Sequence, residues 1–157
     1  MQLFVRSLLL LMACAVPFAT AADGEFDESI PFVKAVSIAD VTTEVVSQKK
    51  PAVVFVTQPW CGACKGLKRD INGNKEFQKS LDKFVVAHVV GDDGKEWQFP
   101  GETDGYIPRV YFLDTAGKMV DLKGPNAKYG RFFSSGNSVQ DAALKLLKQQ
   151  TGLSGEL

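Results

Sequence analysis

The sequence predicts a single α/β domain in which helices flank a central mixed β-sheet, and three observations support this. Two continuous apolar runs, residues 52–57 (AVVFVT) and 84–90 (FVVAHVV), are typical of strands covered on both faces. A helical pattern between them favours a right-handed crossover and a parallel pair. RVYFLD and KMVDL then predict a hairpin around residues 115–117. A chain of 157 residues has room for one such core.

Helices are indicated by capping patterns and by the spacing of apolar residues. Ser37 to Asp40 has the pattern of a capping box, and Pro51 follows the end of that helical segment. A break at residues 72–74 (NGN) divides the segment that joins the two strands. A polar connection, residues 91–108, precedes the hairpin. The expected helices cover residues 37–48, 64–71, 75–83 and 137–151.

The N-terminal residues 1–21 have the features of a secretory signal peptide. Arg6 precedes an apolar run, and residues 19–21 (ATA) fit a cleavage site. The run is too short for a membrane span, which takes about 20 apolar residues. We expect an extended or loosely ordered lead-in at residues 22–36. The domain then covers 37–152, and 153–157 form a C-terminal tail.

The segment QPWCGACKGLK places Cys61 and Cys64 two residues apart, and we considered three roles for the pair. A structural zinc site takes four Cys or His ligands. With Cys14 removed in the signal peptide, these cysteines and the one histidine, His88, supply at most three. A structural disulfide that closes so short a loop stabilises the fold little. We therefore interpret the pair as a redox-active disulfide that requires no metal and no organic cofactor.

The spacing of the cysteines assigns them different roles. Positions i and i+3 at the start of a helix put both sulfur atoms on one face. The helix dipole and the free N–H groups favour a negative sulfur at the first position. Cys61 is therefore the expected attacking thiolate and Cys64 the resolving thiol. The supporting residues that we expect around them are Trp60, Gly62, Ala63, Lys65 and Tyr106.

Two motifs together resemble the thioredoxin-fold family, and within it the small oxidoreductases of the endoplasmic reticulum. They are PWCGACKGLK and, about 40 residues later, GYIPRVYFLDTAGK. The resemblance extends over residues 51–152 and implies the thioredoxin fold and a protein-disulfide oxidoreductase. Its implied partners are cysteine-containing protein substrates, with glutathione or another disulfide carrier. It also implies a cis bond between Ile107 and Pro108, facing the disulfide, where the backbone pairs with a substrate chain.

The chain departs from the family pattern at three places. Many members have a buried acid six residues before the first cysteine, where this chain has Phe55. Isomerases place His between the cysteines, where this chain has Ala63, and this predicts a less oxidising pair. The last four residues, SGEL, have Gly155 where a retention signal has an acidic residue. We expect the lumen of the endoplasmic reticulum, with secretion or a bacterial periplasm as alternatives.

Two other functions remain open at this stage. A non-enzymatic module that holds unfolded or cysteine-containing clients would use the same fold and the aromatic residues Trp97, Phe99 and Tyr106 of the polar connection. A bacterial periplasmic reductase, anchored by a lipid on Cys14, is the second alternative. The formal net charge of zero gives no indication of a nucleic-acid partner. We expect His88 to be a packed residue, and Asp92 and Asp93 to lie in a solvated turn.

Overall fold

The computed structural model describes residues 24–102 and 105–152, so the expected signal peptide, Cys14 and the C-terminal tail lie outside the described residues. The helices are α1 (Ile38–Gln48), α2 (Gly62–Gly73), α3 (Lys75–Ser80) and α4 (Gly136–Gln150). The strands are β1 (Phe32–Val33), β2 (Ala52–Thr57), β3 (Val85–Val90), β4 (Arg109–Leu113) and β5 (Met119–Val120). Two 3-10 segments, Leu81–Lys83 and Gly91–Glu96, precede and follow β3.

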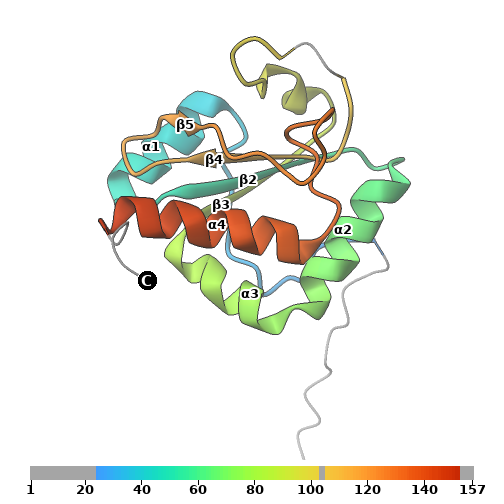
Figure 1. Cartoon of the computed structure of the whole chain (residues 1–157), viewed down its shortest axis with the longest axis horizontal. Coiled ribbons are helices and arrows are strands. Elements are labelled where there is room, and N and C mark those ends of the chain that lie inside the picture. The colour runs from blue at the N-terminus through green and yellow to red at the C-terminus, as the bar shows by residue number, and fades with distance from the viewer. Residues whose placement is uncertain (1–23, 103–104, 153–157) are drawn as a thin grey trace, which may run out of the picture.

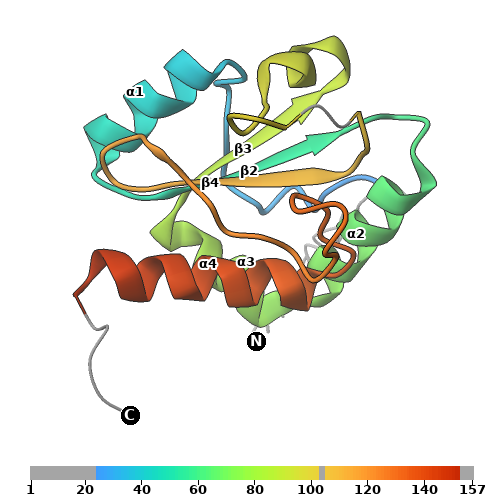
Figure 2. The same cartoon turned by 45° about the horizontal axis from the view of Figure 1, so that its top comes forward.

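The five strands form one mixed sheet with the order β1-β3-β2-β4-β5. Strands β1 and β2 both run parallel to β3, and β4 runs antiparallel to its neighbours β2 and β5. Helix α1 lies on one face of the sheet, and α2, α3 and α4 lie on the other (Figures 1 and 2). This arrangement confirms the predicted α/β domain, including the parallel pair and the hairpin.

Strand β2 lies at the centre of the domain, and its alternating side chains divide the core into two layers. Val53 and Phe55 point to the layer that holds Leu67 and Ile71 of α2. Val54 and Val56 point to the opposite layer, which α1 covers with Val41 and Val45. All six residues of β2 are buried, as the continuous apolar run predicted. The segment that follows β2, which carries Cys61 and Cys64, therefore starts from a strand that is packed on both faces.

The lead-in before α1 is part of the packed structure. Its residues Phe26 and Ile30 are 8% and 4% exposed, and the ring of Phe26 lies 5.1 Å from that of Phe55. Strand β1 extends the sheet by pairing with β3. The segment is rich in acidic residues, but its apolar side chains cover the edge of the core below α2. We expected an extended or loosely ordered lead-in at residues 22–36; in the part that the structure describes, Phe32–Val33 is extended as β1 and the segment is packed.

None of the helices in the described residues is both long enough and apolar enough to cross a bilayer.

Candidate redox site at the start of helix α2

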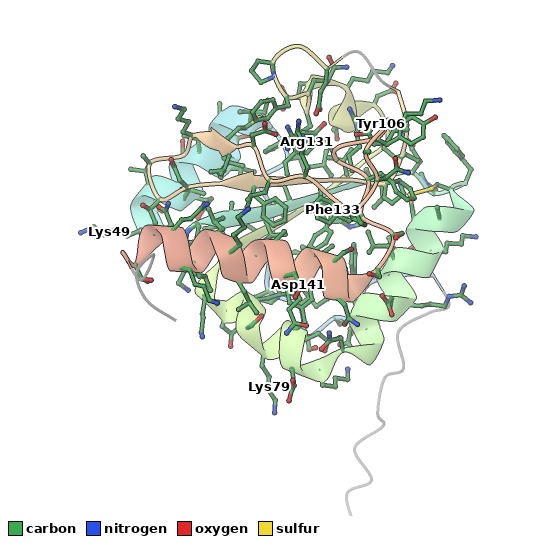
Figure 3. All side chains as sticks on the ribbon, viewed as in Figure 1. Lys49, Lys79, Tyr106, Arg131, Phe133 and Asp141 are labelled. Atoms are coloured by element: carbon green, nitrogen blue, oxygen red, sulfur yellow. A yellow bond between two sulfur atoms is a disulfide. The ribbon has the colours of Figure 1, made fainter. Side chains whose placement is uncertain are left out.

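Cys61 and Cys64 are joined by a disulfide at the N-terminal end of α2, where Figure 3 shows the sulfur–sulfur bond. Cys61 is the N-cap residue of this helix, and its Sγ accepts a hydrogen bond of 3.1 Å from the backbone N–H of Cys64. A turn closed by the Cys61 N–H and the Gln58 carbonyl, at 3.1 Å, leads into the helix. The first-turn N–H groups therefore lie where they stabilise a negative charge on the Cys61 sulfur.

The sulfur of Cys61 lies beside the loop that precedes β4. Its Sγ is 3.8 Å from the carbonyl oxygen of Ile107, and the bond between Ile107 and Pro108 is cis, as the resemblance implied. The two segments are 46 residues apart in the chain and meet because β2 and β4 are neighbours in the sheet. Cys61 is 5% exposed and Cys64 is 1% exposed. The expected attacking residue is thus the more accessible of the two.

Four of the expected supporting residues surround the disulfide on the surface. Gly62, Ala63 and Lys65 are exposed in the first turn of α2. Trp60, adjacent to Cys61 in the chain, is 78% exposed and offers a large apolar surface to a partner.

Tyr106, the fifth expected supporting residue, packs against a loop. Its hydroxyl accepts a hydrogen bond of 2.6 Å from the N–H of Arg131, and its ring lies 4.7 Å from that of Tyr129. Figure 3 labels Tyr106 and Arg131 together at this end of the molecule. The side chain is directed toward the irregular loop before α4 because that loop supplies its polar and aromatic partners.

Trp97 and Phe99 also pack against the fold. Trp97 is fully buried, and its Nε1–H donates to the carbonyl of Val36 at 2.7 Å. The guanidinium of Arg131 lies 4.1 Å from the centre of the Phe99 ring. These aromatic side chains hold the connection onto the core. Trp60, by contrast, is a large apolar side chain that remains exposed next to Cys61 in the chain.

The position that carries an acid in many family members is apolar here. Phe55 is fully buried, and its partner across the sheet in β3 is His88. Nε2 of His88 forms a hydrogen bond of 2.8 Å with the hydroxyl of Thr57. Burial, reinforced by the nearby Lys68 cation, lowers the pKa of His88 to about 4. His88 is therefore a neutral, packed residue at physiological pH, as expected.

A charged pair that sequence reasoning missed lies on the buried side of α2. Lys68 follows Cys64 by one helical turn and is 4% exposed, and its Nζ donates to Glu25 Oε2 at 2.9 Å. This hydrogen bond is the main cause that holds the pKa of Glu25 below its ordinary value. The i+4 spacing of Lys68 from a buried cysteine was the available signal for burial, but nothing near it in sequence identified its partner.

Arg109 is the second residue that the sequence analysis missed. It is 7% exposed at the start of β4, and its Nη2 donates to the carbonyl of Gly94 at 2.9 Å. Its Nε is buried and has no hydrogen-bond partner in the described part of the chain. Arg109 lines a pocket of about 250 Å³ together with Trp60 and Ile107. A charged residue that opens an otherwise apolar strand, directly after Ile-Pro, was a usable signal.

Other polar groups do not extend the site. Asp92 pairs with Lys95 at 2.9 Å, and both side chains are largely exposed, as expected for a solvated turn. Across residues 24–102 and 105–152, no three His, Cys, Asp or Glu side chains gather in a way that suits a metal ion. A larger pocket of about 570 Å³ lies between the segment after β5 and α4, and none of the expected site residues lines it.

The cysteine pair caps a helix and faces an Ile-Pro loop, and both are joined to strands of this mixed sheet. Together these features define a domain of the thioredoxin type. The family model described as thioredoxin-like matches residues 37–115, and the chain belongs to this family.

Two curated relatives extend the comparison. The protein disulfide-isomerase of Hordeum vulgare is 33% identical over 94 residues, and that of Triticum aestivum is 32% identical over 100 residues. These matches cover 59% and 62% of this chain. They span only 18% of the length of each relative.

Two solved structures are also similar to the chain. Thioredoxin of Fasciola hepatica gives a TM-score of 0.47 at 22% identity, covering 71% of this chain and 95% of that structure. A thioredoxin-fold protein of Helicobacter pylori gives 0.39 at 16% identity, covering 68% and 88%. The fold assignment rests on the sheet topology and on the family match.

Proposed function

We propose that this protein is a thiol–disulfide oxidoreductase of the secretory pathway that exchanges disulfides with cysteine-containing protein substrates. One observation carries the proposal: the Cys61 sulfur accepts the N–H of Cys64 at the start of α2 and lies 3.8 Å from the Ile107 carbonyl. This places a sulfur stabilised as a thiolate beside backbone that a substrate chain can pair with. The similarity to protein disulfide-isomerases supports protein substrates.

In the oxidising direction, a substrate thiolate attacks Sγ of Cys61 and breaks the Cys61–Cys64 bond. Cys64 leaves as a thiolate and takes a proton from solvent, and a mixed disulfide joins Cys61 to the substrate. A second substrate thiolate then attacks the substrate sulfur of that bond and releases Cys61. The substrate has gained one disulfide and the protein holds two thiols, so two electrons have moved. In the reducing direction, Cys61 attacks and Cys64 resolves.

The proposed compartment is the lumen of the endoplasmic reticulum. Residues 1–21 support entry into the secretory pathway, where oxidising conditions maintain disulfides. The motifs WCGACK and GYIPR resemble those of thioredoxin domain-containing protein 12, a small oxidoreductase of that compartment. Gly155 departs from the usual retention signal, so retention is tested by locating the protein in cells before and after removal of residues 154–157.

The activity is tested by equilibrating the pair with a glutathione series and counting its thiols by mass tagging. A two-electron transition between about −230 and −150 mV would allow the pair to oxidise clients in the secretory pathway. The companion assay follows disulfide formation in a reduced client protein, with Cys61→Ser as the control. A transition below about −260 mV, together with no catalysed disulfide formation, would contradict the proposal and favour the client-binding module.

A further inference from the structure

The pocket beside the disulfide is positively charged. Arg109 and Lys95 both line it, and no aspartate or glutamate occurs among its described lining residues. Lys95 is 77% exposed and already paired with Asp92, so it contributes a screened charge at the rim. Arg109 is different because it is buried and forms no ion pair within the described residues. Within the described residues, the pocket is therefore lined by a buried cation that no carboxylate neutralises.

The guanidinium of Arg109 is held in place but not fully satisfied. Its Nη2 donates to the Gly94 carbonyl, while Nε–H has no acceptor in the part of the chain described. Cζ of this group lies 5.8 Å from the centre of the Tyr111 ring, but the described residues supply no carboxylate to it. Guanidinium stays charged in proteins, and burying a charge without a counter-ion is costly. The positive charge of a guanidinium, with its fork of N–H groups, suits a carboxylate. Because Nε is enclosed, the side of Arg109 that lines the pocket is what a carboxylate there would meet.

The position of the pocket indicates where that carboxylate comes from. Trp60, adjacent to Cys61 in the chain, forms one wall, and Ile107 forms another. The carbonyl of Ile107 lies 3.8 Å from the sulfur that a substrate cysteine must reach. A substrate joined to Cys61 therefore places the residues next to its own cysteine over this pocket.

We propose that the Arg109 pocket binds a carboxylate next to the reacting cysteine of the substrate, so that acidic sequences around a cysteine are preferred. This inference rests on the proposed function, because it concerns substrates of the same disulfide. A client side chain and the carboxylates of glutathione share this chemistry, and the test separates them.

The test measures the equilibrium of mixed disulfides on a Cys64→Ser background. The Cys61 disulfide with 2-mercaptoethanol is exchanged for capped single-cysteine peptides, and the products are counted by intact mass. A single glutamate is moved through the two positions on either side of the cysteine, and each peptide has a glutamine twin. Glutathione is compared with its diester. For each position, the Glu/Gln ratio is the exchange equilibrium constant of the glutamate peptide divided by that of its glutamine twin. It is measured for the protein with Arg109 and for its Arg109→Met and Arg109→Lys variants. Lys118→Gln, at a distant exposed residue, is the control for net charge.

With Arg109, at least one position is expected to favour glutamate by about tenfold, the factor typical of a charge-assisted hydrogen bond. The preference should persist at high ionic strength, fall to within about twofold in Arg109→Met and return in part in Arg109→Lys. Lys118→Gln should leave it unchanged. A preference for glutathione over its diester, without one among the peptides, would identify the small thiol as the source of the carboxylate. A glutamate also changes the thiol equilibrium of the cysteine beside it in the peptide. Because this effect is the same for every protein variant, it cancels when the Glu/Gln ratios of two variants are compared.

Equal Glu/Gln ratios with Arg109 and Arg109→Met at every position, and equal ratios for glutathione and its diester, would overturn the inference. If Arg109→Met does not fold, the NMR signal of the Arg109 Nε–H in the otherwise unchanged chain decides. That signal should shift with the glutamate peptide and not with its twin, and identical shifts would again overturn the inference. If the protein oxidises clients but shows no preference for glutamate, the inference fails and the proposed function stands. If it prefers glutamate but does not oxidise clients, the proposed function fails and the carboxylate site stands.

Discussion

Lys68 and Glu25, 43 residues apart in the chain, form an ion pair of 2.9 Å that fastens the N-terminal segment to the helix that carries the cysteines. The lysine side chain is 5% exposed, whereas the glutamate is 64% exposed. Nζ of Lys68 also lies 5.4 Å from the centre of the Phe26 ring. The pair therefore joins a buried cation to a surface carboxylate, and its two members respond differently to substitution.

Glu25→Gln should lower the free energy of unfolding by about 1 kcal/mol, because it leaves a buried lysine without its carboxylate; we take a modest value because Glu25 is exposed. Lys68→Met should cost less, since methionine fills similar space and leaves no buried charge. Urea denaturation of both oxidised variants measures the difference. A larger loss for Lys68→Met than for Glu25→Gln would show that the ammonium is stabilised mainly by contacts other than the Glu25 ion pair, such as the Phe26 ring.

Stability should fall as the pH is lowered from about 6.5 to about 4. His88 has a folded pKa of about 4 against an ordinary 6.5, so the unfolded chain binds a proton that the folded chain excludes. The unfolded state then gains up to about 3 kcal/mol over this range. Free energies of unfolding at several pH values measure it, and His88→Gln should flatten the dependence. An unchanged slope in that variant would assign the effect to other groups.

Protonation of Glu25 should cause a second loss of stability at lower pH. The pKa of Glu25 is lowered in the folded state, chiefly by the hydrogen bond from Lys68, so its contribution is present above its ordinary value of 4.5 and disappears below it. Glu25→Gln should remove this component, and the His88 component should persist and grow somewhat, because the Glu25 carboxylate raises the pKa of His88. The two substitutions therefore separate the two windows in one series of denaturation curves.

Gly94→Ala should destabilise the protein and disturb the Arg109 pocket. A Cβ at Gly94 would lie 2.5 Å from Cγ1 of Val56, so strand and loop must separate, at a cost of roughly 1–3 kcal/mol. The matched control is Gly66→Ala inside α2, where a Cβ meets nothing within 4 Å. That substitution should stabilise the helix by about 0.5–1 kcal/mol. Thermal unfolding of both variants measures the contrast, and equal shifts would contradict the close approach of Gly94 to β2.

Local patterns were sufficient to predict the parts of the fold that local chemistry determines. The apolar runs identified β2 and β3, and the cysteine spacing placed Cys61 at the start of a helix. The Ile-Pro dipeptide, with the family resemblance, led to the loop that faces the disulfide. In each case the signal lies within a few adjacent residues, or in two motifs that must meet in one fold.

The remaining features depend on contacts between distant segments. The acidic composition of residues 22–36 concealed Phe26, whose burial against Phe55 becomes visible only when the sheet is assembled. Lys68 and Arg109 look like surface charges in sequence, and their burial follows from partners 43 and 15 residues away. The partners of Tyr106 were hidden for the same reason, since they lie in the loop before α4.

The most direct test of the account traps the substrate on one cysteine and not on the other. Cys61 is predicted to attack and Cys64 to resolve, so Cys64→Ser should accumulate mixed disulfides with client proteins while Cys61→Ser should not. The adducts are counted by intact mass after acid quenching, with the double serine variant as the blank. Equal trapping by the two single variants would contradict the assignment of roles, and an absence of trapping by both would contradict disulfide exchange itself.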